Sequence, residues 1–236
     1  AHVAENATLD PAKRYVVLVG DSLTEGWSKA RIAAAMPSIA SRVLQRGISS
    51  DGVGLNARGV KNRLQSSVFD CQPSHVVLHI GVNDIGRDGS RIDATVRTLR
   101  EVVATIQGRL PGVPVILLRV APARGSYAGF NPALATYNGR VNALATELGL
   151  RTIDLHPLFA GQDGQLRPEL ATADGLHWTT AAYDLLGPEI VKAVGAATTT
   201  PPTPPVVAPP AAFPATVETQ ASALNVRDRP MGTVLG

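Results

Sequence analysis

The sequence has few cysteines, no long apolar run and no basic run, and each of these absences excludes a class of structure or partner. A single cysteine, Cys71, excludes a disulfide within the chain. The longest apolar runs, such as residues 113–118, fall well short of the roughly 20 residues that a membrane-spanning helix needs. Charged residues make up 17% of the chain, and its net charge of +3 comes without a basic run of the kind that follows a nucleic-acid backbone. Neither a membrane span nor a nucleic-acid partner is therefore expected.

What is present is the composition and pattern of an α/β protein. The chain has 236 residues, 44% of them hydrophobic, which is enough for one main domain with a full core. Short apolar runs alternate with amphipathic stretches, the pattern of βαβ units around a parallel sheet. The candidate strands are 15–20, 42–45, 75–80, 113–120 and 151–155.

Three longer segments have helical periodicity. In residues 91–110, apolar residues recur at spacings of three and four and form a one-sided stripe. The segment 131–149 repeats the pattern, with Asn131 as the expected cap, Pro132 in the first turn and Gly149 as a stop. The segment 179–197 is the last expected helix, and Pro188 should kink or restart it.

The composition changes abruptly after Ala197, so the main domain is expected to span residues 1–197. Residues 198–214 are rich in proline and threonine and predict an extended spacer. Residues 215–236 contain Leu-Asn-Val-Arg and resemble the opening of a bacterial SH-three-type cell-wall module, of which they would be an incomplete piece or a disordered tail. A generic polar tail is the alternative.

The first candidate strand ends in Gly-Asp-Ser, which places Ser22 at the carboxyl edge of the sheet, where α/β proteins bind ligands. A serine in such a turn can simply cap a helix. Two residues near the end of the domain favour a nucleophile instead. Asp174 and His177 stand three apart before the last helix, and a nucleophilic serine needs an imidazole base whose other nitrogen is held by an acceptor. The other histidines are expected to be structural: His2, His75, His79 and His156.

Acyl transfer to a serine also needs hydrogen-bond donors aimed at the carbonyl oxygen that becomes negative. The stretch Gly-Val-Asn-Asp follows the third candidate strand and presents Asn83 at the same edge as Ser22. Asparagine after a strand is commonly a turn residue, but its coincidence with Ser22 and His177 favours a catalytic role.

With these pieces, the chain resembles the SGNH hydrolase superfamily, also called GDSL esterases, in "GDSLTEGW", "GVND" and "DGLH", which occur in the family order. The resemblance implies a flavodoxin-like three-layer sandwich, with about five parallel strands and helices on both faces. It also implies that Ser22 is the nucleophile, His177 the base, Asp174 the carboxylate that orients it, and Asn83 an oxyanion donor. The backbone amide of Ser22 is expected to be a second donor. No metal or organic cofactor is expected.

The second block departs from the family pattern. The family has Asn-x-Gly-x-x-Gly, whereas this chain has "QRGISSDGVG", and aligning Gly47 with the first family glycine puts Ser50 at the donor position. Serine can donate its backbone amide there provided that the turn does not require a positive φ. Gly52 and Gly54 are the alternatives. Asp21 is expected to support the turn rather than to react.

The sequence gives less information about the substrate class than about the catalytic residues. Aromatic residues are only 4% of the chain, and no amphipathic lid is evident, so a long-chain lipase is disfavoured. The segment 119–131 carries Arg124, Tyr127 and Phe130 and suits either a saccharide-binding rim or a plain loop. Removal of O-acetyl groups from a carbohydrate or cell-wall polymer is the leading interpretation.

Two other interpretations stay open. The first is the same chemistry on lysophospholipids, thioesters or short-chain esters, and the second is a non-catalytic saccharide-binding module. A secreted, periplasmic or cell-surface location is expected from the proline-rich spacer and the wall-module resemblance. The chain also begins at Ala1 rather than Met, which is expected of a mature form whose signal peptide has been removed or of a shortened chain.

Overall fold

A five-stranded parallel sheet forms the centre of the fold in the computed structural model, which describes residues 2–55, 58–85 and 89–196. The strand order is β2-β1-β3-β4-β5. The strands are β1 (Tyr15–Gly20), β2 (Val43–Gly47), β3 (Pro73–His79), β4 (Val115–Leu118) and β5 (Arg151–Ile153). This order is that of flavodoxin-like folds, so the predicted α/β class is confirmed.

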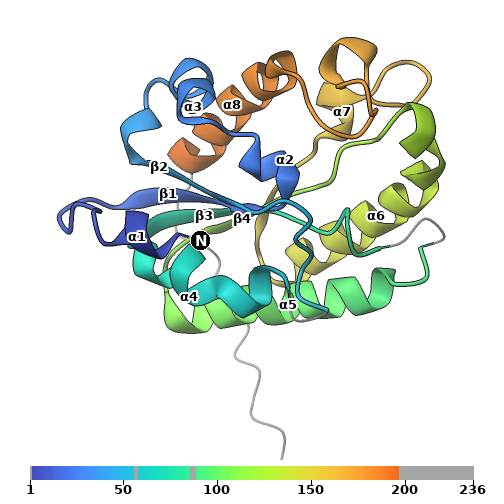
Figure 1. The fold of residues 1–236 in the computed structure, drawn as a ribbon. Helices are drawn as coiled ribbons and strands as arrows, with labels where there is room; N and C mark the ends of the chain where they lie inside the picture. Colours follow the sequence, from blue (N-terminus) through green and yellow to red (C-terminus); the bar gives the residue numbers. More distant parts are fainter. Residues whose placement is uncertain (1, 56–57, 86–88, 197–236) are drawn as a thin grey trace, which may run out of the picture. The chain divides into compact units, whose positions relative to one another are not determined.

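Helices cover both faces of the sheet (Figure 1). The α-helices are α1 (Val3–Asn6), α2 (Ser22–Glu25), α3 (Lys29–Ala35), α4 (Leu64–Ser67), α5 (Ile92–Arg109), α6 (Asn131–Glu147), α7 (His156–Phe159) and α8 (Thr180–Gly195). Short 3-10 helices are η1 (Ala40–Arg42), η2 (Val60–Arg63), η3 (Phe69–Cys71), η4 (Gly125–Phe130) and η5 (Pro168–Leu170). Helices α3 and α8 pack together on one face, and α5 packs with α6 on the other.

The core is continuous through the sheet because both faces of the central strands are covered. Every residue of β1 is buried, as expected of a parallel strand with helices on each side. The predicted stripe of α5 is its buried face, including Leu99, Val103 and Ile106. Cys71 is buried and free of any disulfide.

Two local predictions about helices differ from the structure: the cap at Asn131 and the restart at Pro188. Asn131 does not cap α6, because the 3-10 turn η4 leads directly into the helix and leaves no extended residue for a cap. The Asn131 side chain instead pairs with the backbone of Ala123, at 2.8 Å to its amide and 3.0 Å to its carbonyl.

Helix α8 continues through Pro188 without a restart. Proline cannot donate to the carbonyl of Asp184, four residues earlier. Both residues lie on the exposed side of the helix, where water can satisfy that carbonyl, while the opposite side stays packed in the core.

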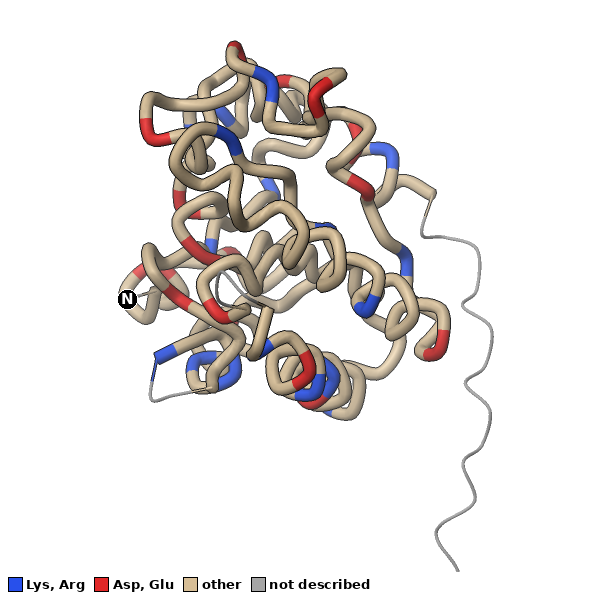
Figure 2. Tube along the Cα trace, turned by 90° about the vertical axis from the view of Figure 1, so that its right-hand side faces the viewer, with Lys and Arg blue, Asp and Glu red and all other residues tan. Residues whose placement is uncertain are grey.

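The spacer predicted at 198–214 and the module-like tail predicted at 215–236 lie outside the described residues. Within the described part, no helix is long and apolar enough to cross a membrane. Figure 2 shows Lys and Arg interspersed with Asp and Glu along the chain rather than gathered on one element.

Candidate active site

The sheet register brings the predicted site segments to one edge. Gly20 at the end of β1 pairs with Gly47 at the end of β2 and with His79 at the end of β3. The loops that follow these ends carry Ser22, Ser50 and Asn83, respectively.

Ser22 is the first residue of α2, after a sharp turn out of β1. The turn requires glycine at position 20, because a Cβ there would lie 2.1 Å from Thr24 Oγ1 and 2.2 Å from the His79 carbonyl oxygen. Asp21 caps α2, since its Oδ1 accepts a hydrogen bond of 3.0 Å from the Leu23 amide. The expectation that Asp21 supports the turn matches these contacts.

The Asp21 carboxyl is fully buried, and its Oδ2 has no hydrogen-bond partner among the described residues. Burial raises the pKa of Asp21 to about 7, and the nearby Asp84 adds to this effect. The Leu23 amide and the proximity of His177 oppose the rise only in part. A raised pKa for the carboxyl beside Ser22 was not anticipated, because the sequence does not reveal the depth of burial.

A chain of hydrogen bonds joins Ser22 to the loop before α8. His177 Nε2 lies 2.9 Å from Ser22 Oγ, and His177 Nδ1 lies 2.5 Å from Asp174 Oδ2. The structure therefore brings together three side chains that span 155 residues of sequence. One tautomer fits both contacts, with the proton on Nδ1 shared with the carboxylate and Nε2 free to accept from the serine hydroxyl.

The loop itself fixes the Asp174 carboxylate. Its Oδ1 accepts hydrogen bonds from the backbone amides of Leu176 (2.9 Å) and His177 (3.0 Å) and from the Thr172 hydroxyl (2.9 Å). Desolvation alone would raise the pKa of Asp174, but the bonds from the His177 ring, the two amides and Thr172 outweigh it and hold the pKa well below its ordinary value. Asp174 is thus a carboxylate at neutral pH. Thr172 was missed in the sequence because nothing in its spacing distinguishes it from a turn residue.

This site is open to solvent rather than enclosed. The side chains of His177 and Asp174 are 42% and 43% exposed. Next to the loop, the Arg124 amide donates to the Gly175 carbonyl at 2.8 Å and ties the start of η4 to it. Half-buried Tyr127 and Phe130 follow on η4, with ring centroids 5.7 Å apart.

Asn83 and Ser50 belong to neighbouring turns. The Asn83 side-chain amide donates to the Asp51 carbonyl at 2.9 Å, which fixes the side chain against the loop that carries Ser50. Ser50 has φ +63°, so the condition that its turn needs no positive φ is wrong. The backbone there has the left-handed conformation that glycine adopts without strain, which agrees with the glycine that the family pattern has at this position.

The alternatives to Ser50 have other roles in the loop. Gly52 lies against Asp84, where a Cβ would be 2.1 Å from the carboxylate. The Asp84 carboxylate accepts from the Val53 amide at 2.8 Å, and this contact needs the close approach that Gly52 allows. Gly54 lies farther along, against Lys61.

Among the described residues, no hydrogen bond joins Ser22 Oγ to any of the histidines that were expected to be structural. His79 is buried in β3 with its ring centroid 5.2 Å from that of Trp178, and burial lowers its pKa to about 4. Among the described residues, no group of three or more His, Cys, Asp or Glu side chains could hold a metal ion.

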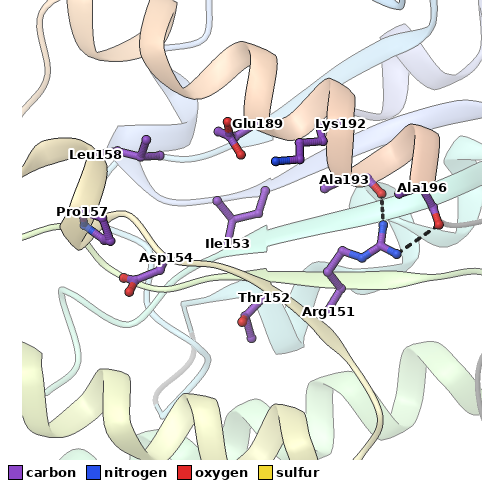
Figure 3. A pocket seen from close by; sticks show the side chains of 10 residues that line it. All are labelled: Arg151, Thr152, Ile153, Asp154, Pro157, Leu158, Glu189, Lys192, Ala193 and Ala196. Atoms are coloured by element: carbon purple, nitrogen blue, oxygen red, sulfur yellow. Dashed lines mark hydrogen bonds between the residues drawn. The ribbon is translucent and has the colours of Figure 1, made fainter.

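A groove of about 470 Å³ runs along the free edge of β5 beside α7 and α8 (Figure 3). Arg151, Glu189 and Lys192 are among its lining residues, and the Arg151 guanidinium bonds the carbonyls at the end of α8. Ser22 and His177 do not line it, so the groove is separate from the serine site.

Arg63 also contacts the segments that carry the site, and the sequence analysis predicted no role for it. Its guanidinium contacts the ends of β1 and β2 and the loop after β2. A single arginine in an irregular stretch gives no periodicity or spacing from which this could be predicted.

Comparison with known proteins gives one consistent result. The sequence model of the GDSL-like lipase/acylhydrolase family matches residues 18–185. Among solved structures, a GDSL-like lipase from Bacteroides thetaiotaomicron is 24% identical, with a TM-score of 0.68 over 82% of this chain and 95% of that chain. A lipase/acylhydrolase from Enterococcus faecalis is 28% identical, with a TM-score of 0.60 over 77% of this chain and 95% of that chain.

An acetylxylan esterase from Geobacillus stearothermophilus is 20% identical, with a TM-score of 0.61 over 77% of this chain and 94% of that chain. No curated protein sequence matches the chain.

Proposed function

Because the chain belongs to the GDSL-like lipase/acylhydrolase family and is a hydrolase, we propose that it cleaves carboxylic esters through an acyl-enzyme on Ser22. The observation that carries this proposal is the hydrogen-bonded chain from Asp174 through His177 to Ser22 Oγ. A serine hydroxyl held 2.9 Å from an imidazole nitrogen has the geometry of an activated nucleophile.

In the first half of the reaction, Ser22 Oγ attacks the ester carbonyl while its proton passes to His177 Nε2. The Asp174 carboxylate holds the ring and stabilises the imidazolium that forms. The C–O bond then breaks, and Nε2–H gives its proton to the leaving alcohol, which leaves an acyl group on Ser22. In the second half, water gives a proton to Nε2, attacks the acyl carbonyl and releases the acid and the serine hydroxyl.

The negative oxygen formed in each half needs donors at the same edge of the sheet. We assign this role to the backbone amides of Ser22 and Ser50 and to the side-chain amide of Asn83. Ser50 keeps the role although its φ is positive, because it takes the left-handed conformation of the glycine that the family pattern has there. The bond to Asp51 uses one of the two hydrogens of the Asn83 amide, and among the described residues the second has no acceptor and can serve this role. Removing one such donor from an esterase costs about 3 kcal/mol in the barrier.

The substrate class that the site suits best is an O-acetyl ester on a carbohydrate or cell-wall polymer. The exposure of His177 and Asp174 leaves room for an ester on a bulky polymer, and a small acetyl group needs no long acyl tunnel. The aromatic pair Tyr127 and Phe130 lies on η4, which is tied to the loop that carries His177, and suits stacking against a sugar ring. One protein of this fold is an acetylxylan esterase, so the fold is compatible with such substrates.

This substrate class fits a secreted, periplasmic or cell-surface protein, and we propose that location. Its support is the composition of residues 198–236, with a proline-rich stretch followed by a segment that resembles a wall module.

The nucleophile is tested by Ser22→Ala, which should reduce hydrolysis of p-nitrophenyl acetate by at least about 10⁴-fold because no other hydroxyl contacts His177 Nε2 among the described residues. Ser41→Ala, at an exposed serine on η1, is the matched control and should keep the wild-type rate. An organophosphonate should label Ser22 in peptide mass analysis. Wild-type turnover by Ser22→Ala, or an adduct on another residue, would contradict the assignment.

The substrate class is tested by comparing kcat/KM on acetylated oligosaccharides with a series of acyl esters from acetyl to long chains. The acetylated saccharides should give the highest values, and rates should fall as the acyl chain lengthens. A maximum at long acyl chains, at lysophospholipids or at thioesters would replace the carbohydrate proposal and leave the chemistry of Ser22 intact.

A further inference from the structure

The guanidinium of Arg63 makes four hydrogen bonds, most of them to the segments that carry the serine site. Arg63 ends η2, and its side chain is only 13% exposed. Nε donates to Asp51 Oδ2 at 2.6 Å, Nη2 to the Gly20 carbonyl at 2.8 Å, and Nη1 to the Arg46 carbonyl at 2.9 Å and to Ser67 Oγ at 2.7 Å.

Three of these contacts reach the segments that carry the proposed oxyanion donors. Gly20 ends β1 and stands two residues before Ser22. Asp51 follows Ser50, and its carbonyl accepts the hydrogen bond from the Asn83 side chain. Arg46 stands one residue before the end of β2, from which the Ser50 loop departs.

We propose that Arg63 is a positioning residue that fixes the amides of Ser22, Ser50 and Asn83 relative to one another. The inference rests on the proposed function and deepens it. The donors come from three different strand ends, and the contacts of Arg63 join all three directly or through Asp51. Oxyanion stabilisation depends on donors that are already in place before the charge develops, so a shared anchor acts on the transition state.

The chemistry of the side chain suits this role. A guanidinium presents its donors in a rigid planar fork, so contacts to several acceptors fix directions as well as distances. Lysine has the same charge but a single nitrogen on a flexible stem, and cannot reach the Asp51 carboxylate and two carbonyls in the same arrangement. Burying such a pair gives little net stability after desolvation, which leaves geometry as its main effect.

Arg46 provides a matched comparison within the same protein. Its side chain is fully buried and also makes a carboxylate pair, with Glu5 at 2.7 Å. Its other contacts are Asn6 Oδ1 and the Gln45 carbonyl. Arg46 thus anchors the N-terminal helix α1, whereas Arg63 anchors the edge of the sheet that carries the site.

The test compares Arg63→Lys with Arg46→Lys by steady-state kinetics on p-nitrophenyl acetate. Arg63→Lys should lower kcat by about 10²-fold, the loss typical of one misplaced oxyanion donor, with KM within about threefold of wild type. Inactivation by the organophosphonate should slow in parallel, because its phosphoryl oxygen needs the same donors. Arg46→Lys should lower the unfolding midpoint without a comparable fall in kcat.

A second pair of variants decides the question if Arg63→Lys does not fold. Asp51→Asn removes the carboxylate from the Arg63 cluster but keeps the carbonyl that binds Asn83, and Glu5→Gln makes the equivalent change at Arg46. Asp51→Asn should lower kcat by about tenfold with KM unchanged, and Glu5→Gln should not.

The outcomes separate this inference from the proposed function. If Ser22→Ala is inactive while Arg63→Lys keeps wild-type kcat, the positioning role is overturned and the esterase assignment stands. If the Arg63 and Arg46 variants, or the two carboxylate variants, lose kcat equally, the effect is general destabilisation and the inference is also overturned. A wild-type protein without esterase activity would overturn both.

Discussion

At the scale of single residues, the buried Asp21 carboxyl makes stability depend on pH. It caps α2 through one oxygen, while the other is buried without a partner among the described residues. Burial favours the protonated form of such a group: it raises the pKa of Asp21 to about 7, whereas an unfolded aspartate titrates at about 3.9.

The sign of the pH effect follows from this difference. Between pH values of about 4 and 7, the folded state binds more protons than the unfolded state, so the free energy of unfolding falls as the pH rises. The slope from this one group approaches about 1.4 kcal/mol per pH unit and vanishes above the folded pKa.

Asp21→Asn should therefore remove this slope, because an asparagine caps the helix equally well and does not titrate. Its free energy of unfolding should exceed that of wild type at pH 8 and approach it at pH 4, as measured by urea unfolding across that range. Asp184→Asn makes the same change on the exposed side of α8 and should leave the slope in place. An unchanged slope in Asp21→Asn would show that another group carries it.

Sequence reasoning at this scale found residues whose chemistry is visible in their type and spacing, namely Ser22, Asn83, Asp174 and His177. It did not find the features that arise only when distant segments of the chain pack together. The positive φ of Ser50 belongs to an irregular loop, and the role of Arg63 exists only once three strand ends lie together. Neither leaves a local pattern in the chain.

At the scale of elements, the sequence predicted all five strands and the three long helices, but their ends less well. The bounds of β1 are as predicted, whereas β2 ends two residues later than the predicted residue 45, at Gly47. The predicted strand stopped before the charged residue Arg46, although Arg46 is buried in β2 by its contacts with Glu5 and Asn6. Alternation rules cannot anticipate a charged residue that is buried against a partner distant in sequence.

The packing of α8 on α3 gives a prediction at this scale. Gly187 allows the two helices to approach, because a Cβ there would lie 2.5 Å from the Ala35 carbonyl oxygen and 2.6 Å from the Ala35 Cβ. Gly187→Ala should therefore lower the free energy of unfolding by about 1 to 3 kcal/mol, despite the better helix propensity of alanine.

Gly139 is the matched control, since it lies inside α6, where an added Cβ would meet nothing within 4 Å beyond the backbone of its own helix. Gly139→Ala should raise the free energy of unfolding by about 0.5 to 1 kcal/mol, because alanine loses less entropy on folding. Urea unfolding of both variants is the measurement. Stabilisation by both substitutions would show that α3 and α8 have room to separate.

At the scale of the whole molecule, the alternation of strands and helices was sufficient for the fold class, because right-handed crossovers leave few arrangements for five parallel strands. The flavodoxin-like arrangement of the strands was implied by the family resemblance and not by the alternation of strands and helices. Once the order is fixed, the ends of β1, β2 and β3 must meet at one edge, and this is why motifs far apart in sequence converge on one site.

The remaining prediction concerns the extent of the catalytic unit. The family match ends at residue 185, and the hydrogen bonds described above for Ser22, His177 and Arg63 lie within the part of the chain that the structure describes. A chain ending at Ala197 should keep kcat on p-nitrophenyl acetate within about twofold, and its Tm should stay within about 3 °C of the full chain, which corresponds to about 1 kcal/mol at this size. The resemblance of residues 215–236 to a wall module also predicts that this segment associates with the cell wall. In a sedimentation assay with insoluble cell wall, the full chain should therefore bind more than the shortened one. A large loss of Tm or of kcat on the small ester would show that residues 198–236 stabilise the site itself, and equal binding of both chains would remove the wall-anchoring role of the tail.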